Sequence, residues 1–183
     1  ATLGEPSAMS SLLTMLGDPR PSVRVGTIQA LIEIGDRNAV PSILPLLGDR
    51  NSSVREAAIE ALGILGDPRG VESLISLLKD AETLIRLTAI TALGKIGDRR
   101  ATMPLIKGLR EGDPATRWFS AEALGRLKDP TAVNDLIELL KDQDGPHWED
   151  KKICEIAAES LEMIGTPEAR AAIVRWHSKQ AGT

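Results

Sequence analysis

Apolar residues recur along the chain at helical spacing. In residues 40–47 they fall at positions i, i+3, i+4 and i+7, which places them on one stripe of a helix. Residues 54–65 have a second stripe of the same kind. Short connections join such segments, so consecutive helices are expected to be antiparallel neighbours.

The whole pattern returns every 31 residues, as the Gly-Asp pairs at 35, 66 and 97 illustrate. Half a unit at 5–16 precedes the first copy, and the last copy carries six extra residues near 143–150. We therefore predict a single repeat domain over residues 1–183, with the regular period running to about residue 140 and a capping helix at 167–177.

Each unit contains two helices with recognisable ends. Asp-Pro pairs such as Asp67-Pro68 start helices, and glycines such as Gly66 end them. Pro41 and Pro45 predict a kink within one helix. Eleven helices are predicted: 6–16, 21–34, 37–47, 52–65, 68–78, 83–96, 99–109, 114–127, 130–140, 146–164 and 167–177. No such helix pair buries its stripe alone, so the fold class is all-α, a right-handed α-solenoid of about five units.

The segment Asp49 to Leu78 carries the pattern Asp-x5-Val-Arg-x3-Ile-x-Ala-Leu-Gly-x-Leu-Gly-Asp-x2-Gly-Val-x2-Leu-Ile-x2-Leu. With it, residues 7–177 resemble HEAT repeats of the short E–Z type, which are also called phycobilin-lyase-like repeats. The resemblance implies an α-solenoid and says little about function.

One arginine recurs in four units, each time six residues after an acid. The arginines are Arg24, Arg55, Arg86 and Arg117, and the acids are Asp18, Asp49, Asp80 and Glu111. This spacing favours a structural ladder of charge-assisted bonds, although four arginines in a row could also bind phosphate or carboxylate. Similarly, the aspartates at 36, 67, 98 and 129 are interpreted as helix caps rather than as a file of metal ligands.

The second helix of each unit has a variable stripe opposite its packed side, which the resemblance places on the concave face. It contains an apolar patch with a charged rim, a composition typical of a protein-binding hot spot. The patch is Leu84, Leu87, Trp118, Phe119 and Ile156, and the rim is Glu56, Glu60, Glu122 and Arg126. Alternatively, Trp118 and Phe119 pack against the insertion at 143–150 and belong to the core.

Charge and composition exclude several function classes. The net charge of -4 and the isoelectric point near 5.3 argue against a nucleic-acid binder, and no apolar run is long enough for a membrane span. Cys154 has no second cysteine to pair with. A cytoplasmic location is therefore expected, with no cofactor or metal. His147 beside Glu149 could suggest a metal or an acid/base pair, but a single loop histidine predicts no catalysis.

We therefore predict a non-enzymatic scaffold that binds another protein or peptide on its concave face. The alternative is a bilin lyase subunit or a bilin-binding chaperone, because the repeats resemble those of phycobilin lyases. A deoxyhypusine hydroxylase needs His-Glu pairs, which His147 and His177 do not form, and the groove acids oppose a DNA glycosylase. The chain could also form a homo-oligomer or be part of a longer array.

Overall fold

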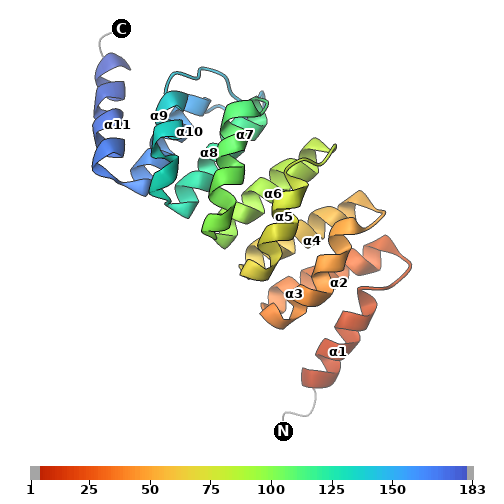
Figure 1. Ribbon diagram of the computed structural model, residues 1–183. Helices are drawn as coiled ribbons and strands as arrows, with labels where there is room; N and C mark the ends of the chain where they lie inside the picture. Colours follow the sequence, from red (N-terminus) through yellow and green to blue (C-terminus); the bar gives the residue numbers. More distant parts are fainter. Residues whose placement is uncertain (1–4, 181–183) are drawn as a thin grey trace. The chain divides into compact units, whose positions relative to one another are not determined.

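The structure, a computed structural model, describes the backbone of residues 5–180 and the side chains of residues 9–180 (Figure 1). The ends of the predicted domain, 1–4 and 181–183, lie outside these residues. All regular elements between residues 5 and 180 are helical: eleven α-helices and five short 3-10 helices, with no strand. The chain is an α-solenoid, as its repeat pattern predicts. It divides into two compact units, residues 1–92 and 93–183, while the single repeat domain stays a prediction.

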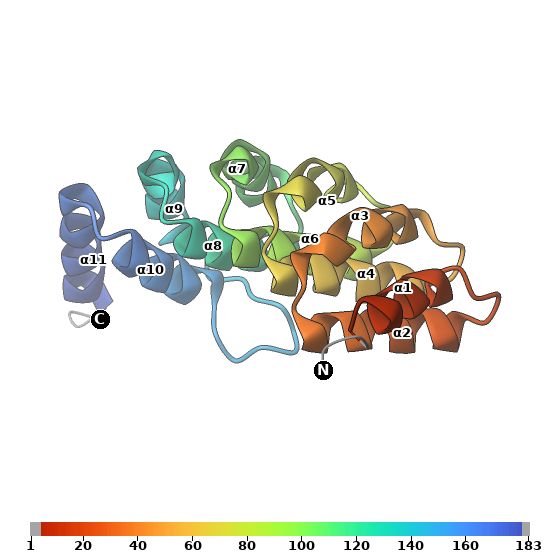
Figure 2. The same ribbon diagram turned by 90° about the horizontal axis from the view of Figure 1, so that it is seen from below.

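Unit 1 arranges its helices in two layers, with α3 and α5 in one and α2, α4 and the start of α6 in the other (Figure 2). Helices α2 and α4 pack directly against each other. The elements are α1 (Glu5–Met15), α2 (Pro21–Ile34), η1 (Arg37–Ala39), α3 (Val40–Ile43), η2 (Leu44–Gly48), α4 (Ser52–Leu65), η3 (Pro68–Gly70), α5 (Val71–Leu77) and α6 (Thr83–Ile96), of which residues 83–92 belong to this unit.

Unit 2 continues the alternation of helices, and α8 packs against both α7 and α10. Its elements are the end of α6, η4 (Arg99–Ala101), α7 (Thr102–Glu111), α8 (Pro114–Leu127), η5 (Pro130–Ala132), α9 (Val133–Leu139), α10 (Ile153–Ile164) and α11 (Pro167–Gln180). Large aliphatic side chains fill the core of each unit, for example Leu62 in unit 1 and Leu124 in unit 2, which are both fully buried.

The helix ends follow the predicted capping chemistry. The carboxylates of Asp36, Asp67, Asp98 and Asp129 each accept a hydrogen bond from the backbone N–H two residues later, at 2.9 to 3.0 Å. Each aspartate starts a 3-10 turn that leads into the α-helix. Glycines with φ between 63° and 74° follow four of the second helices, and Lys128 takes the same left-handed conformation at φ 52°.

Two segments depart from a regular helix. The predicted helix at 37–47 divides into α3 and the 3-10 helix η2, with Pro41 and Pro45 in the first turn of each, so the prolines interrupt it as expected. The predicted helix at 146–164 is wrong in its first half, because α10 begins only at Ile153. Backbone N–H groups at the start of α10 donate to the carbonyls of Asp142 and Asp144, which ties residues 141–152 into a loop.

Second helices approach each other at glycines that the sequence analysis did not single out. A Cβ added to Gly63 would lie 2.8 Å from the Cα of Ala92, and one added to Gly94 would lie 2.9 Å from the Cα of Ala123. A Cβ at Gly125 would lie 2.8 Å from the Cα of Ser160. These glycines recur every 31 residues, so the spacing of the helices depends on the absence of a side chain there.

Candidate interaction surface

In unit 1 the variable stripe of the second helices lies largely exposed on α2, α4 and the first part of α6. We call this stripe the acidic face. Its residues are Ser22, Val25, Gly26, Gln29, Glu33, Ser53, Glu56, Ala57, Glu60, Ile64, Leu84, Leu87, Thr88 and Thr91. Leu84 is 57% exposed and Ile64 is 52% exposed, whereas Leu87 is buried.

The charges of the acidic face have one sign. Glu33, Glu56 and Glu60 are its only charged residues, and none of them forms an ion pair within the described part of the chain. Carboxylates held on a folded surface without a counter-charge attract cations, so this face suits a basic partner.

In unit 2 the predicted apolar patch is mostly interior. Trp118 is only 8% exposed, and its indole N–H donates to the backbone carbonyl of Lys151 at 3.3 Å. Phe119 is half-buried and meets Trp118 edge to face at 5.0 Å between ring centroids, and Ile156 is buried. The expectation of an exposed Trp-Phe pair is therefore wrong. The inserted loop covers Trp118, which is the alternative that the sequence left open.

The inserted loop is held to α8 by charge-assisted bonds. Arg117 donates through Nε to Asp142 and through one terminal nitrogen to Asp144, both at 2.8 Å. Its other terminal nitrogen donates to the carbonyl of Gly112 at 3.0 Å. Burial acts to lower the pKa of Arg117, but the two aspartates outweigh it and the pKa lies above its usual value. The loop is thus a fixed cover of α8.

The charges on the second helices of unit 2 are largely neutralised. Arg126 pairs with Glu122 at 2.7 Å and Lys151 pairs with Glu159 at 2.6 Å. The hydrogen bond from Lys151 to Glu159 raises the pKa of the lysine. Both pairs are partly exposed, so they contribute little to stability. They do remove the unbalanced charge that distinguishes unit 1.

The repeated arginines bond differently from the predicted ladder. Arg24, Arg55 and Arg86 donate to the backbone carbonyl of the acid six residues earlier, at 2.7 to 2.8 Å, rather than to its carboxylate. Arg86 also donates to the hydroxyl of Thr83 at 3.0 Å.

The ion pairs of these arginines run forward along the chain. Arg24 pairs with Asp49 at 2.7 Å, and Arg55 pairs with Glu82. The predicted acids are thus engaged one unit later, because the guanidinium at the start of a second helix reaches the turn of the following unit. Burial acts to raise the pKa of Asp49, but the hydrogen bonds from Arg24 and Asn51 outweigh it and the pKa lies below its usual value.

Several turn carboxylates titrate at unusually low pH. Hydrogen bonds from Arg20 lower the pKa of Asp18 to about 2, and hydrogen bonds from Arg69 lower the pKa of Asp67 to about 2. Arg100 lowers the pKa of Asp98 in the same way. These groups stabilise turns, and their carboxylates are occupied by their own neighbours.

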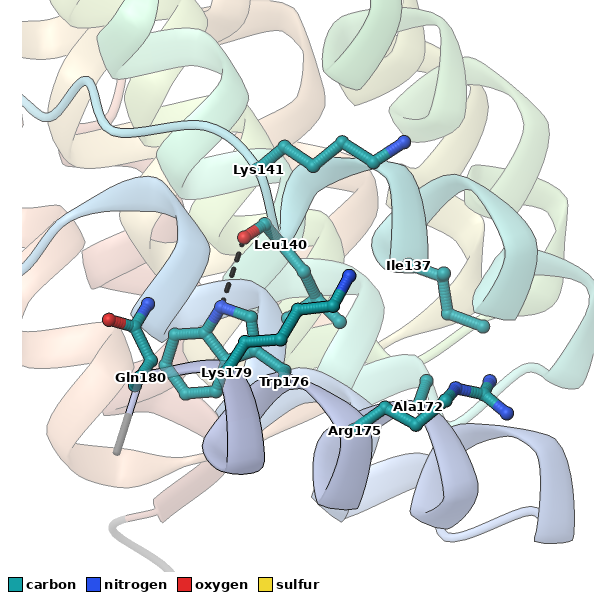
Figure 3. Close-up of a pocket in the computed structure, with 8 residues that line it drawn as sticks. All are labelled: Ile137, Leu140, Lys141, Ala172, Arg175, Trp176, Lys179 and Gln180. Carbon is teal, nitrogen blue, oxygen red and sulfur yellow. Dashed lines mark hydrogen bonds between the residues drawn. The ribbon is translucent and has the colours of Figure 1, made fainter. Parts of the chain in front are cut away.

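A groove that the sequence analysis missed lies between α9 and α11 of unit 2 (Figure 3). It has a volume of about 280 Å³ and is lined by Ile137, Leu140, Lys141, Ala172, Arg175, Trp176, Lys179 and Gln180. The only sequence signal was Trp176 within an otherwise aliphatic pattern, which had been interpreted as shielding of the array's end.

Other chemistry finds no support among the described residues. No group of three or more His, Cys, Asp or Glu side chains in this part of the chain is arranged to hold a metal ion. None of its helices combines the length and apolar character that crossing a membrane requires. Cys154 is buried, and burial raises the pKa of its thiol.

Solved structures with this arrangement of helices include engineered and natural repeat proteins. An engineered protein is 22% identical, with a TM-score of 0.63 over 92% of this chain and 84% of the other. A designed armadillo repeat protein in complex with the peptide (KR)4 is 16% identical, with a TM-score of 0.59 over 93% and 88%. These two likenesses concern the fold alone.

The complex of CpcE and CpcF of phycocyanin lyase from Nostoc gives a TM-score of 0.61 at 25% identity, over 75% of this chain and 63% of that chain. The present chain thus spans less than two thirds of that protein's length. Among curated proteins, no sequence matches significantly.

The HEAT-repeat family model matches residues 9–86 and again residues 71–148. These matches cover most of both units and include the recurring arginines and the capping aspartates. The resemblance inferred from the pattern of residues 49–78 is thereby confirmed. The chain belongs to the HEAT-repeat family.

Proposed function

We propose that this protein is a non-enzymatic interaction scaffold that binds a basic, extended segment of a partner protein on the acidic face of unit 1. The observation that carries the proposal is the set of three carboxylates without ion pairs, Glu33, Glu56 and Glu60, on one exposed stripe. Ile64 and Leu84 add exposed apolar contact area to the same stripe. A partner with lysines or arginines beside an apolar residue would satisfy both features.

The geometry of stacked helices suits an extended chain. Packed helices lie roughly 8–10 Å apart, and an extended chain advances about 3.3–3.6 Å per residue. Each step from one second helix to the next therefore corresponds to about three residues of the partner. The designed armadillo repeat protein that carries a (KR)4 peptide supports the idea that stacked helices can hold such a segment.

The test is fluorescence anisotropy with a labelled peptide of alternating lysine and arginine. We expect binding that weakens as salt is added, and the double variant Glu56→Gln with Glu60→Gln should weaken it about tenfold, because each exposed charge pair contributes ~0.2–1 kcal/mol. The matched control is Glu149→Gln with Glu162→Gln, which removes two exposed acids from unit 2. Equal weakening by both double variants would refute the proposed face.

A second candidate function is a bilin lyase subunit or a bilin-binding chaperone. It rests on the 25% identity to the CpcE and CpcF complex of phycocyanin lyase. A bilin that binds would change its visible absorbance when the pure protein is added. An unchanged spectrum at saturating protein would argue against this candidate and leave the scaffold proposal intact.

A further inference from the structure

The groove between α9 and α11 has an apolar floor fixed by a tryptophan. Ile137, Leu140 and Ala172 line it together with the half-buried ring of Trp176 (Figure 3). The indole N–H donates to the carbonyl of Leu140 at 3.0 Å, which holds the ring in place. The floor is therefore preorganised, and an apolar side chain that enters would not have to order it.

The charged side chains that line the groove are all cationic. Lys141 pairs with Glu138 at 2.9 Å on the exposed side of α9. Arg175 and Lys179, one turn apart on α11, form no ion pair with any residue from 9 to 180. Like charges at this spacing destabilise a helix slightly. Lys179 also offsets the dipole at the end of α11, but Arg175 lies too far from that end to do so.

We propose that this groove binds an acidic peptide segment, in which one apolar side chain occupies the floor and flanking Asp or Glu residues meet Arg175 and Lys179. Arginine and lysine on a rim supply carboxylate partners, and the apolar floor supplies the contact area. The volume of about 280 Å³ lies below the usual range for small-molecule pockets, so it suits a single large side chain. This proposal concerns unit 2 and a partner of opposite charge to the one proposed for unit 1.

The net charge of the whole chain makes the proposal demanding. At -4, the protein as a whole repels an acidic peptide, so such a peptide can bind only at a local basic site. Non-specific attraction therefore cannot imitate the expected result.

The test is fluorescence anisotropy on the full chain with a labelled, N-acetylated Asp-Glu-Leu-Glu-Asp amide. We expect binding at low salt and about tenfold weaker binding to the double variant Arg175→Gln with Lys179→Gln. Arg50→Gln with Lys79→Gln removes two exposed cations from unit 1 and should leave the affinity within about twofold of the wild type, as surface changes elsewhere do.

Replacing the leucine of the probe by serine tests the floor and should weaken binding several-fold. The proposal is overturned if the leucine peptide does not bind at low salt, if both double variants bind equally, or if the serine peptide binds as well as the leucine peptide. The Glu56→Gln, Glu60→Gln variant should bind the acidic probe like the wild type. Failure of the groove and failure of the acidic face are thus observed with different peptides and different variants.

Discussion

At the scale of single residues, the recurring arginines differ in how much solvent reaches their ion pairs. The pair of Arg24 and Asp49 is almost dry, with 6% and 9% of the side chains exposed, whereas Glu82, the partner of Arg55, is 52% exposed. Removing one member of a buried pair leaves an uncompensated charge, which costs roughly 3–5 kcal/mol, while exposed pairs contribute about 1 kcal/mol or less.

We therefore expect Arg24→Ala to lower the free energy of unfolding by about 3 kcal/mol and Arg55→Ala by about 1 kcal/mol. Urea denaturation measures both. Salt at molar concentration should reduce only the effect of Arg55→Ala, because exposed charges are screened. Equal losses for the two variants would show that burial does not govern these pairs.

Two buried serines of unit 2 provide a second contrast. The hydroxyl of Ser160 donates to the carbonyl of Ala121 at 2.8 Å, whereas the hydroxyl of Ser120 is buried with no partner. A buried hydroxyl without a hydrogen bond costs about 1–3 kcal/mol, and a hydrogen bond contributes about 1 kcal/mol.

Ser160→Ala should thus destabilise the protein by about 1 kcal/mol, whereas Ser120→Ala should leave it unchanged or stabilise it by up to about 1 kcal/mol. Thermal unfolding of the two variants beside the wild type checks the sign. A marked loss from Ser120→Ala would mean that its hydroxyl has a partner after all.

At the scale of elements, the close approach of second helices makes one glycine indispensable and another replaceable. A Cβ at Gly94 would meet the backbone of Ala123 at 2.9 Å, whereas a Cβ at Gly26, inside α2, meets nothing within 4 Å. Gly94→Ala forces two helices apart and should cost about 2–3 kcal/mol, in the range for overpacking. Gly26→Ala should stabilise the protein by about 0.5–1 kcal/mol.

Chemical denaturation of these two alanine variants tests the element-scale prediction directly. The outcome that contradicts it is destabilisation by Gly26→Ala as large as that by Gly94→Ala. In that case helix propensity and packing would not separate the two positions.

The helices themselves could be predicted because their ends carry local signals. Asp67 caps and Gly66 terminates through contacts with their own neighbours in sequence. The start of α10 could not, since the insertion breaks the period and its loop is held by Arg117 from another helix. The burial of Trp118 depends on that same loop, so no stripe analysis of α8 alone could find it.

The arginine pairing was predictable in composition but not in register. Asp49 lies 31 residues after Asp18, so Arg24 uses the expected acid column of the next unit. Sequence spacing alone cannot distinguish a partner six residues back from one 25 residues ahead. Only the stacking of units brings the second within reach. The groove of unit 2 was missed for the same reason, because α9 and α11 are separated in sequence by all of α10.

At the scale of the whole molecule, turn carboxylates in both units link stability to pH. The pKa values of Asp18 and Asp67 lie at about 2, below the ordinary value of 3.8, and that of Asp98 is also lowered. The unfolded chain therefore binds protons more readily than the folded one as the pH falls. We expect stability to be constant from neutral pH to about 5 and to decline progressively between about pH 5 and pH 2.

Urea midpoints measured across this range check the expectation. Asp67→Asn keeps a good capping side chain but removes one titrating group, so its decline with acid should be shallower than that of the wild type. A stability that rises on acidification below pH 5 would contradict the low pKa values.

The forward reach of the arginines also determines where the array can be cut or spliced. A protein shortened after α2 would keep Arg24 in its nearly dry position but lose Asp49, and the same holds for any chimera whose next module lacks an acid in that turn. A module of this array is therefore not one period of the sequence but a period together with the first turn of its successor. Shortened versions should be designed with an apolar residue in place of the last arginine.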